Sequence, residues 1–503
     1  MKTLLQKFRH LFDPIDLTSG KILPSFLAFL IPIVLSMIFQ QIYSITDAII
    51  VGQNLSENEI AGINDAIPIA NMVLNFSIGC TSGFSVILGN AIGEKNEKKA
   101  KESILIQVIL SLVISVLMMI LSYFLIDPLL ALIKITPSSS NPNMQAIYQA
   151  SKDYLVVLLV FGTMASMLYN LIVSILRVMG DSFTPFLFLV LSTILNIILD
   201  LIFVIPLQLG VKGSAIATIL SQGIAMILAF LYAFQRYPIF RIHKGEVKIT
   251  GKDFFHHLTL GIPLGFQWSI LFIGVITMSG AVIPFDIISE TEMVIGNPAQ
   301  VGYGVANKLT GLLMGCYSAL GTGLLAFFAQ NLGAKQYKRI RKGFQLSCYL
   351  TIIIALFCFT VGMLLSINGT YQRIFLSSDK ITEASIKYGN AYLYVALPFF
   401  IPLGFIYVGR NAVQAFEKPF FPLLSGIVEL LTRVLVCLYL PPFINKGPID
   451  ASASFGSYLS VCFADPITWV ASMIVVIIPT IYYIYKKFPR ENVLDFKPNE
   501  PQA

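Results

Sequence analysis

Long apolar segments separated by short polar loops run through most of this chain. Each segment is long enough to cross the hydrocarbon core of a bilayer, which needs about 20 apolar residues in a helix. The pattern predicts twelve membrane-spanning helices, at about residues 22–51, 62–90, 104–126, 153–176, 185–206, 213–235, 259–283, 299–330, 344–368, 388–409, 419–440 and 458–485. The loops leave no room for a soluble domain. We therefore expect an all-α polytopic membrane protein.

Composition agrees with this pattern. Of 503 residues, 56% are hydrophobic and only 12% are charged, and the mean hydropathy is +0.78. Soluble domains carry about 25% charged residues. The six cysteines lie in or beside apolar segments, so packing is a better explanation for them than a disulfide framework or a zinc site.

The distribution of basic residues predicts the orientation. If the N-terminus is cytoplasmic, most of the 34 Lys and Arg residues fall in segments on that side of the membrane. This bias follows the positive-inside rule and places both termini in the cytoplasm. The net charge of +7 therefore orients the chain in the bilayer and does not call for nucleic acid as a partner. Short loops suit a bacterial inner (cell) membrane.

The chain repeats itself once. Five residues recur in kind 240 positions later: Gly62, Gly83, Gly93, Lys95 and Lys98. Because each repeat would hold six spans, an even number, the two repeats share one orientation and form pseudo-symmetric six-helix bundles.

This repeat predicts the domain organisation. We expect a cytoplasmic N-terminal segment, an N-terminal six-helix bundle, a cytoplasmic linker, a C-terminal six-helix bundle and a cytoplasmic tail, at residues 1–21, 22–235, 236–258, 259–485 and 486–503 respectively. Two joined bundles around a central cleft are typical of transporters, in which one bundle rocks against the other.

Charged and polar residues inside the apolar segments are the first functional candidates. Asp47 lies in the first span, and a carboxylate there costs about 2.5–3.5 kcal/mol on insertion scales. Asn196 and Asp200 share one face of the fifth span, and Thr218 lies in the sixth. We place these side chains at similar depth, which predicts an oxygen-rich site for Na⁺ or for a shared proton. The alternative is that backbone or water satisfies each group separately.

The second half does not copy this arrangement. Met278 stands near the position that matches Asp47, and Glu429 and Arg433 replace the Asn–Asp pair. The candidates for substrate contact or gating are Glu429, Arg433, Asp465 and Lys308. Pairing between Glu429 and Arg433 is an equally good interpretation, because an unpaired buried charge is costly.

Several short motifs, taken in order along the chain, resemble the multidrug and toxic compound extrusion (MATE) family. The segments that carry the resemblance are 31–32, 47–52, 176–181, Pro185, the Asn196–Asp200 pair, 213–218 and 330–334. The resemblance implies a V-shaped pair of six-helix bundles. It also implies export of small amphipathic or cationic organic compounds by antiport with Na⁺ or H⁺, without a cofactor.

The resemblance also implies site residues. The family's cation site, which would hold Na⁺ in a Na⁺-coupled member, matches Asp47, Asn196, Asp200 and Thr218, and Asn170 matches a further polar position of the family. Gln267 and Trp268 are candidates for the substrate cleft, with core packing as the alternative.

Three other functions deserve comparison. A lipid-linked saccharide flippase of the same superfamily would be expected to show a strongly basic cavity or extra spans. A major-facilitator transporter would carry a Gly-x-x-x-Asp-Arg-x-Gly type signature after its second span, where this chain reads Gly93-Glu-Lys-Asn-Glu-Lys-Lys. A channel or a non-transporting receptor is a third alternative. No P-loop, nucleophile–base arrangement or metal-ligand spacing indicates an enzyme, and we expect a monomer in the lipid bilayer.

Overall fold

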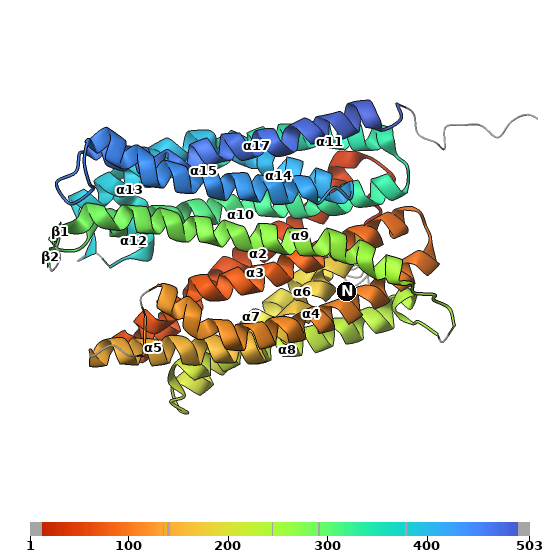
Figure 1. Ribbon diagram of the computed structural model, residues 1–503. Helices are drawn as coiled ribbons and strands as arrows, with labels where there is room; N and C mark the ends of the chain where they lie inside the picture. The colour runs from red at the N-terminus through yellow and green to blue at the C-terminus, as the bar shows by residue number, and fades with distance from the viewer. Residues whose placement is uncertain are drawn as a thin grey trace, which may run out of the picture.

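Long, roughly antiparallel helices lie side by side in the computed structural model, which describes residues 13–133, 135–137, 141–243, 245–289, 292–377 and 380–490 (Figure 1). The first half contains α2 (Ile22–Asn54), α3 (Glu57–Gly93), α4 (Glu97–Leu132), α5 (Pro142–Leu155), η1 (Val156–Phe161), α6 (Thr163–Val178), α7 (Phe183–Val204), α8 (Gly210–Arg236) and η2 (Pro238–Phe240).

The second half repeats the plan with more breaks. It contains α9 (Gly251–Val282), η3 (Ile283–Asp286), β1 (Ile287–Ser289), β2 (Glu292–Met293), α10 (Pro298–Gly333), α11 (Tyr337–Ser366), η4 (Ile367–Gly369), α12 (Thr370–Phe375), α13 (Glu383–Ala396), η6 (Leu397–Phe399), α14 (Phe400–Ala415), α15 (Phe420–Asn445), α16 (Phe455–Cys462), α17 (Ala464–Tyr482) and η7 (Tyr483–Lys487). The two short strands form one antiparallel hairpin.

The predicted all-α polytopic fold is confirmed, with local differences. Among the described residues, eleven helices are long and apolar enough to span a membrane. A twelfth span exists if α5 with η1 and α6, which meet at a bend of 52°, are counted together. Several helices also run beyond the predicted apolar segments because polar residues cap them outside the apolar stretch. α3, for example, begins at Glu57 through a capping box between Ser56 and Glu59.

The two halves contact each other because one helix of each half packs against a helix of the other. α2 of the first half packs against α10 of the second, and α9 of the second half packs along α3 of the first. The α3–α9 contact is very close, since a Cβ added at Gly79 would lie 2.3 Å from Leu264 O. Gly83 approaches Gly261 in the same way. The small residues of α3 therefore permit backbone contact between the halves.

One end of the molecule is closed by a pair of symmetry-related glycines. A Cβ at Gly93 would lie 2.0 Å from Gln330 O, and a Cβ at Gly333 would lie 2.0 Å from Asn90 O. Gln330 Nε2 also donates to Val178 O at 2.8 Å. These two glycines are 240 residues apart, so the internal repeat of the sequence appears in space as a crossing of α3 and α10. We call this region the closed end; the described chain termini lie on the same side (Figure 1).

Polar contacts reinforce the closed end. Asn90 of α3 donates a hydrogen bond to Glu417, and His256 Nε2 lies 3.1 Å from the other carboxylate oxygen. Burial acts to raise the pKa of Glu417, but the contacts from His256 and Asn90 outweigh it and hold that pKa below its ordinary value. The carboxylate thus stays charged in the joint between the halves.

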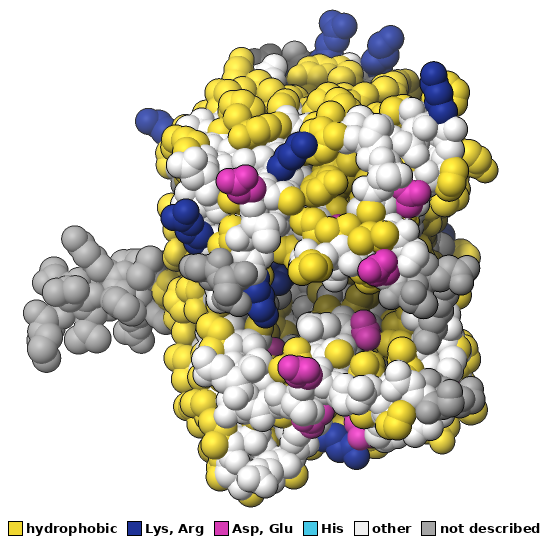
Figure 2. Space-filling view, turned by 90° about the vertical axis from the view of Figure 1, so that its left-hand side faces the viewer, with side chains coloured by type: hydrophobic (Ala, Val, Ile, Leu, Met, Phe, Trp, Pro, Cys, Tyr) yellow, Lys and Arg dark blue, Asp and Glu magenta, His cyan; other side chains and the backbone are white. Residues whose placement is uncertain are grey.

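The opposite end is open. Figure 2 looks at this face, and a hollow lies near its centre. Acidic and basic side chains appear around the hollow, while yellow hydrophobic side chains cover much of the flanks. The halves therefore meet at the closed end and diverge toward the open end, which gives the arrangement the V shape that the family resemblance implied.

Replacing Gly93 with Ala should weaken the closed end. The new Cβ would collide with backbone that cannot move independently, and overpacking of this kind costs about 1–3 kcal/mol. We expect a cysteine placed at Ser82, in a background without native cysteines, to become reactive toward an impermeant maleimide added on the side of the chain termini. Gly311→Ala is the matched control, because a Cβ there meets nothing within 4 Å. Equal maleimide reactivity of the cysteine at position 82 in Gly93→Ala and Gly311→Ala would contradict the role of Gly93 in the closed end.

Candidate functional site

Two carboxyl groups converge inside the first half. Asp47 of α2 and Asp200 of α7 are close enough to interact directly, although they are 153 residues apart in sequence. Ser214 of α8 donates to Asp47 Oδ1 at 3.4 Å. Asp200 is fully buried, whereas Asp47 is half-buried. Three helices thus bring two acidic groups and a hydroxyl to one point.

An amide and a second hydroxyl complete this cluster. Asn196 Nδ2 donates to Thr218 Oγ1 at 3.4 Å, and the Tyr43 hydroxyl lies 3.3 Å from the same oxygen. The Asn196–Asp200 spacing of four residues turns both side chains of α7 toward α2 and α8. We call Asp47, Asn196, Asp200 and Thr218 the acidic cluster.

The acidic cluster has oxygens with no hydrogen-bond donor. Within the described part of the chain, both carboxylate oxygens of Asp200 and the amide oxygen of Asn196 are buried without a hydrogen-bond partner. Buried polar atoms are normally satisfied, and leaving one unpaired costs about 1–3 kcal/mol, more for a charged group. Oxygens arranged in this way suit a hard cation or a proton.

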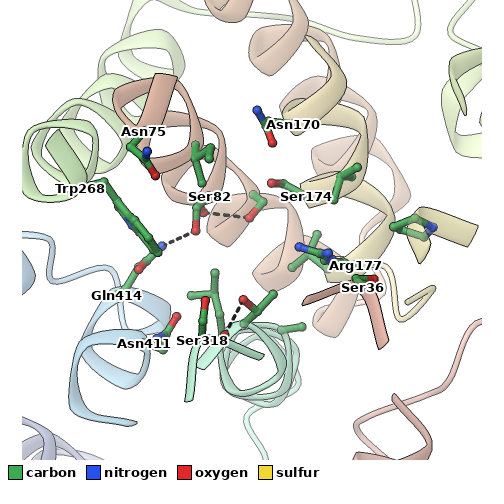
Figure 3. Close-up of a pocket in the computed structure, with 18 of the residues that line it drawn as sticks. Ser36, Asn75, Ser82, Asn170, Ser174, Arg177, Trp268, Ser318, Asn411 and Gln414 are labelled. Carbon is green, nitrogen blue, oxygen red and sulfur yellow. Dashed lines mark hydrogen bonds between the residues drawn. The ribbon is translucent and has the colours of Figure 1, made fainter. Parts of the chain in front are cut away.

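A separate cavity lies between the two halves. It has a volume of about 300 Å³ and is lined from α2, α3, α6, α7, α9, α10 and α14. Figure 3 shows polar side chains pointing into it from both halves: Ser36, Asn75, Ser82, Asn170, Ser174, Arg177, Trp268, Ser318, Asn411 and Gln414. Gln414 Nε2 donates to Ser82 Oγ at 2.9 Å and so connects the second half with the first. We call this space the central cavity.

The central cavity contains three of the residues singled out in the sequence. Gln267 and Trp268 both line it from α9. Asn170 lines it from α6, and its amide donates to Ser166 O at 2.9 Å. Among the described residues, no hydrogen bond joins Asn170 to the acidic cluster, so the structure places this residue with the cavity and not with the carboxylates.

With this geometry described, the chain can be compared with known protein families. The sequence model of the MatE family matches residues 32–202 and 293–439. The chain belongs to the MatE family. It is therefore a membrane transporter of the multidrug efflux type and not an enzyme.

Individual MatE relatives are similar over most of their length. The "Probable multidrug resistance protein YpnP" of Bacillus subtilis (strain 168) is 28% identical over 329 residues, which cover 65% of this chain and 68% of that protein. The "FAD transporter" of Shewanella oneidensis is 24% identical over 425 residues, which cover 83% and 84%. A solved structure described as an outward-facing multidrug resistance MATE family transporter superposes with a TM-score of 0.78 at 18% identity, covering 94% of this chain and 98% of that one.

The second half of this MatE protein holds a charged network. Arg433 Nη2 lies 2.7 Å from Asp465 Oδ1 and 3.3 Å from Glu429 Oε1. Arg410 pairs with the other oxygen of Glu429, and Tyr392 donates to Asp465 Oδ2 at 2.7 Å. Glu429 and Arg433 thus pair as the i, i+4 spacing suggested, within a larger set. A cavity of about 130 Å³ adjoins this network.

Lys308 lies apart from the network. It is exposed on α10 and forms no ion pair with any described residue. It also does not line either cavity.

Two arginines were missed in the sequence. The predicted spans ended at residues 176 and 409, which placed Arg177 and Arg410 outside the membrane. In the structure α6 continues to Val178 and α14 to Ala415, so both guanidinium groups lie within helices and line the central cavity. An arginine within one turn of a predicted span end is the signal that would have found them, because span ends are the least certain part of such predictions.

Removing Arg433 should destabilise this MatE protein strongly. Arg433→Leu leaves Asp465 buried with only the Tyr392 hydroxyl, and breaking a buried ion pair costs about 3–5 kcal/mol. Unfolding of the detergent-solubilised protein by denaturant would measure the loss of free energy of unfolding.

Lys308→Leu is the control, since it also removes a positive charge from a helix of the second half. A second variant, Arg433→Leu with Asp465→Leu, should regain part of the loss because no unpaired carboxylate remains. If Arg433→Leu unfolds no more easily than the control, the network does not contribute to stability.

Proposed function

We propose that this MatE protein is a secondary active exporter that exchanges amphipathic organic compounds for Na⁺ or H⁺. The coupling ion binds at the acidic cluster, and the exported compound binds in the central cavity. The observation that carries this proposal is the set of buried oxygens on Asp200 and Asn196 that have no hydrogen-bond partner among the described residues.

Electrostatics explains why an ion is required. Two carboxylates held close together in a site shielded from water repel each other unless a positive charge or a proton compensates. Among the described residues, no Lys or Arg forms an ion pair with Asp47 or Asp200. A cation from solution therefore supplies the missing charge. A Na⁺ ion would take oxygens of Asp47, Asn196, Asp200 and Thr218, whereas a proton would be shared by the two carboxyl groups.

The fold supports a route for exchange. The closed end lies on the side of the chain termini, and the hollow of Figure 2 lies on the opposite side. With both termini in the cytoplasm, as the distribution of Lys and Arg suggests, the cavity faces the outside of the cell membrane. This is the state in which an exporter releases its substrate and takes up its coupling ion.

Relatives support a transporter of drug-like molecules without fixing the charge of the substrate. One relative is called a multidrug resistance protein and another an FAD transporter. FAD carries a negatively charged pyrophosphate, so transport among these relatives is not limited to organic cations. A lipid-linked saccharide flippase is not favoured, because the family match and these relatives indicate multidrug efflux.

Neutralising either carboxylate should abolish coupling. We expect Asp47→Asn and Asp200→Asn each to reduce gradient-driven transport in proteoliposomes to the level of protein-free liposomes. Both variants should still fold, because Asn fills the same space and removes a charge from the membrane. Transport of ethidium and of fluorescein is measured under a Na⁺ gradient and, separately, under a pH gradient.

Asp127→Asn is the matched control, since Asp127 is a half-exposed carboxylate of the first half that pairs with Lys152. It should transport as the unmodified protein does. Undiminished transport by both cluster variants would remove the acidic cluster from the mechanism. The gradient that drives transport identifies the coupling ion.

A further inference from the structure

We propose that the central cavity binds the negatively charged group of an amphipathic organic anion, with Arg177 as its counter-charge. This inference rests on the proposed function, since it names the substrate class of the same exporter. It departs from the preference for organic cations that the family resemblance implied.

The charge of the cavity lining is the first observation. Ser, Asn, Gln, Tyr and apolar side chains supply most of the lining, and no Asp or Glu occurs among the described residues that form it. The two charged residues of the lining, Arg177 and Arg410, are both basic. A cavity that selects organic cations would be expected to offer a carboxylate, because a desolvated cation needs a compensating negative charge.

The two arginines differ in whether their charge is already compensated. Arg410 pairs with Glu429 and also donates from Nε to Ser425 Oγ at 3.0 Å. Arg177 forms no ion pair with any described residue, and its Nε–H is buried without an acceptor there. The nearest acid along the chain, Asp181, accepts instead from the Tyr237 hydroxyl at 2.6 Å. Arg177 therefore has an unused charge and an unused donor.

The surroundings of Arg177 suit an anion. Figure 3 shows its guanidinium directed into the cavity near Ser36, and Ser174 stands one turn earlier on the same helix. These hydroxyl groups can donate hydrogen bonds to the oxygens of a carboxylate, sulfonate or phosphate ester. A guanidinium binds such groups through two parallel hydrogen bonds, which are roughly twice as strong as neutral ones.

The position of Arg177 gives the anion a fixed place in the transport path. Arg177 precedes Val178, whose carbonyl accepts the hydrogen bond from Gln330 at the closed end. The residue that carries the guanidinium thus lies next to the contact that separates the cavity from the side of the termini. The apolar part of the substrate then faces Trp268, Leu271 and Leu325 of the second half.

Two dyes of nearly the same size and opposite charge test this proposal. Fluorescein is an anion, and rhodamine 110, taken as its methyl ester so that it carries no carboxylate, is a cation built on the same ring system. Equilibrium binding to the purified full-length chain in nanodiscs, measured by fluorescence anisotropy without any ion gradient, gives a Kd for each dye. We expect the unmodified protein to bind fluorescein at least about tenfold more tightly than rhodamine 110.

Variants assign the preference to Arg177. Arg177→Gln should weaken fluorescein binding about tenfold or more and leave rhodamine 110 binding equal or stronger, and Arg177→Lys should retain part of the preference. Ser174→Asp provides an independent route, because it places a carboxylate beside Arg177 while keeping the arginine. Arg236→Gln is the control, since it removes an exposed arginine that pairs with Asp13 outside the cavity. Melting temperatures establish that each variant is folded.

The outcomes are distinct. Tighter binding of rhodamine 110 than of fluorescein by the unmodified protein overturns the proposal, as does an unchanged fluorescein Kd in both Arg177→Gln and Ser174→Asp. A loss of transport in Arg177→Gln with unchanged Kd values would show that this residue acts in closing the cavity and not in recognition. Because binding is measured without a gradient, failure of ion coupling would leave the dye preference intact, and the reverse also holds.

Discussion

A charge inside a lipid bilayer must find its compensation within the protein or from a bound ion, and this constraint organises the whole molecule. Water does not reach the hydrocarbon core, so an uncompensated carboxylate or guanidinium there is costly. The second half meets the constraint internally, since Arg410 and Arg433 are matched by Glu429 and Asp465. The first half leaves oxygens of its acidic cluster without a donor among the described residues.

The two halves carry opposite charges at corresponding positions of α7 and α15. Asn196 and Asp200 on α7 correspond to Glu429 and Arg433 on α15, with the same spacing of four residues. Where the first half has an acid, the second has a guanidinium covalently attached to the protein. We infer that the second half cannot exchange its positive charge with solution. Under the proposed function, ion exchange is therefore confined to the first half.

The fold and the convergence of the residues of the acidic cluster could be predicted from the sequence, because both depend on patterns that extend over long stretches of the chain. Twelve apolar segments, glycines 240 residues apart and an Asn–Asp pair spaced four residues apart survive errors of several residues at span ends. The lining of the central cavity was harder to predict from the sequence. Arg177 and Arg410 lie within a few residues of span ends, and the placement of Asn170 depends on the bend between α5 and α6, for which a π-helix and Gly162 are responsible. The exact helix ends and the bend depend on side-chain packing, which the periodicity of apolar residues in the sequence does not reveal.

A single helix connects the three parts of the proposed mechanism. At one end of α2, Phe26 and Leu30 contact Gly323 of α10 near the closed end. In its middle, Ser36 and Gln40 line the central cavity, and Asp47 belongs to the acidic cluster about 30 Å from Phe26 at 1.5 Å per residue.

Pro32 lies between the first contact and the cavity, and it removes one backbone donor from the helix. The Ser36 hydroxyl donates to Pro32 O at 2.8 Å, a contact that often accompanies a bend. Under the proposed function, an ion at Asp47 that displaces α2 changes the cavity wall directly, and the turn at Pro32 determines how much of the movement reaches the closed end.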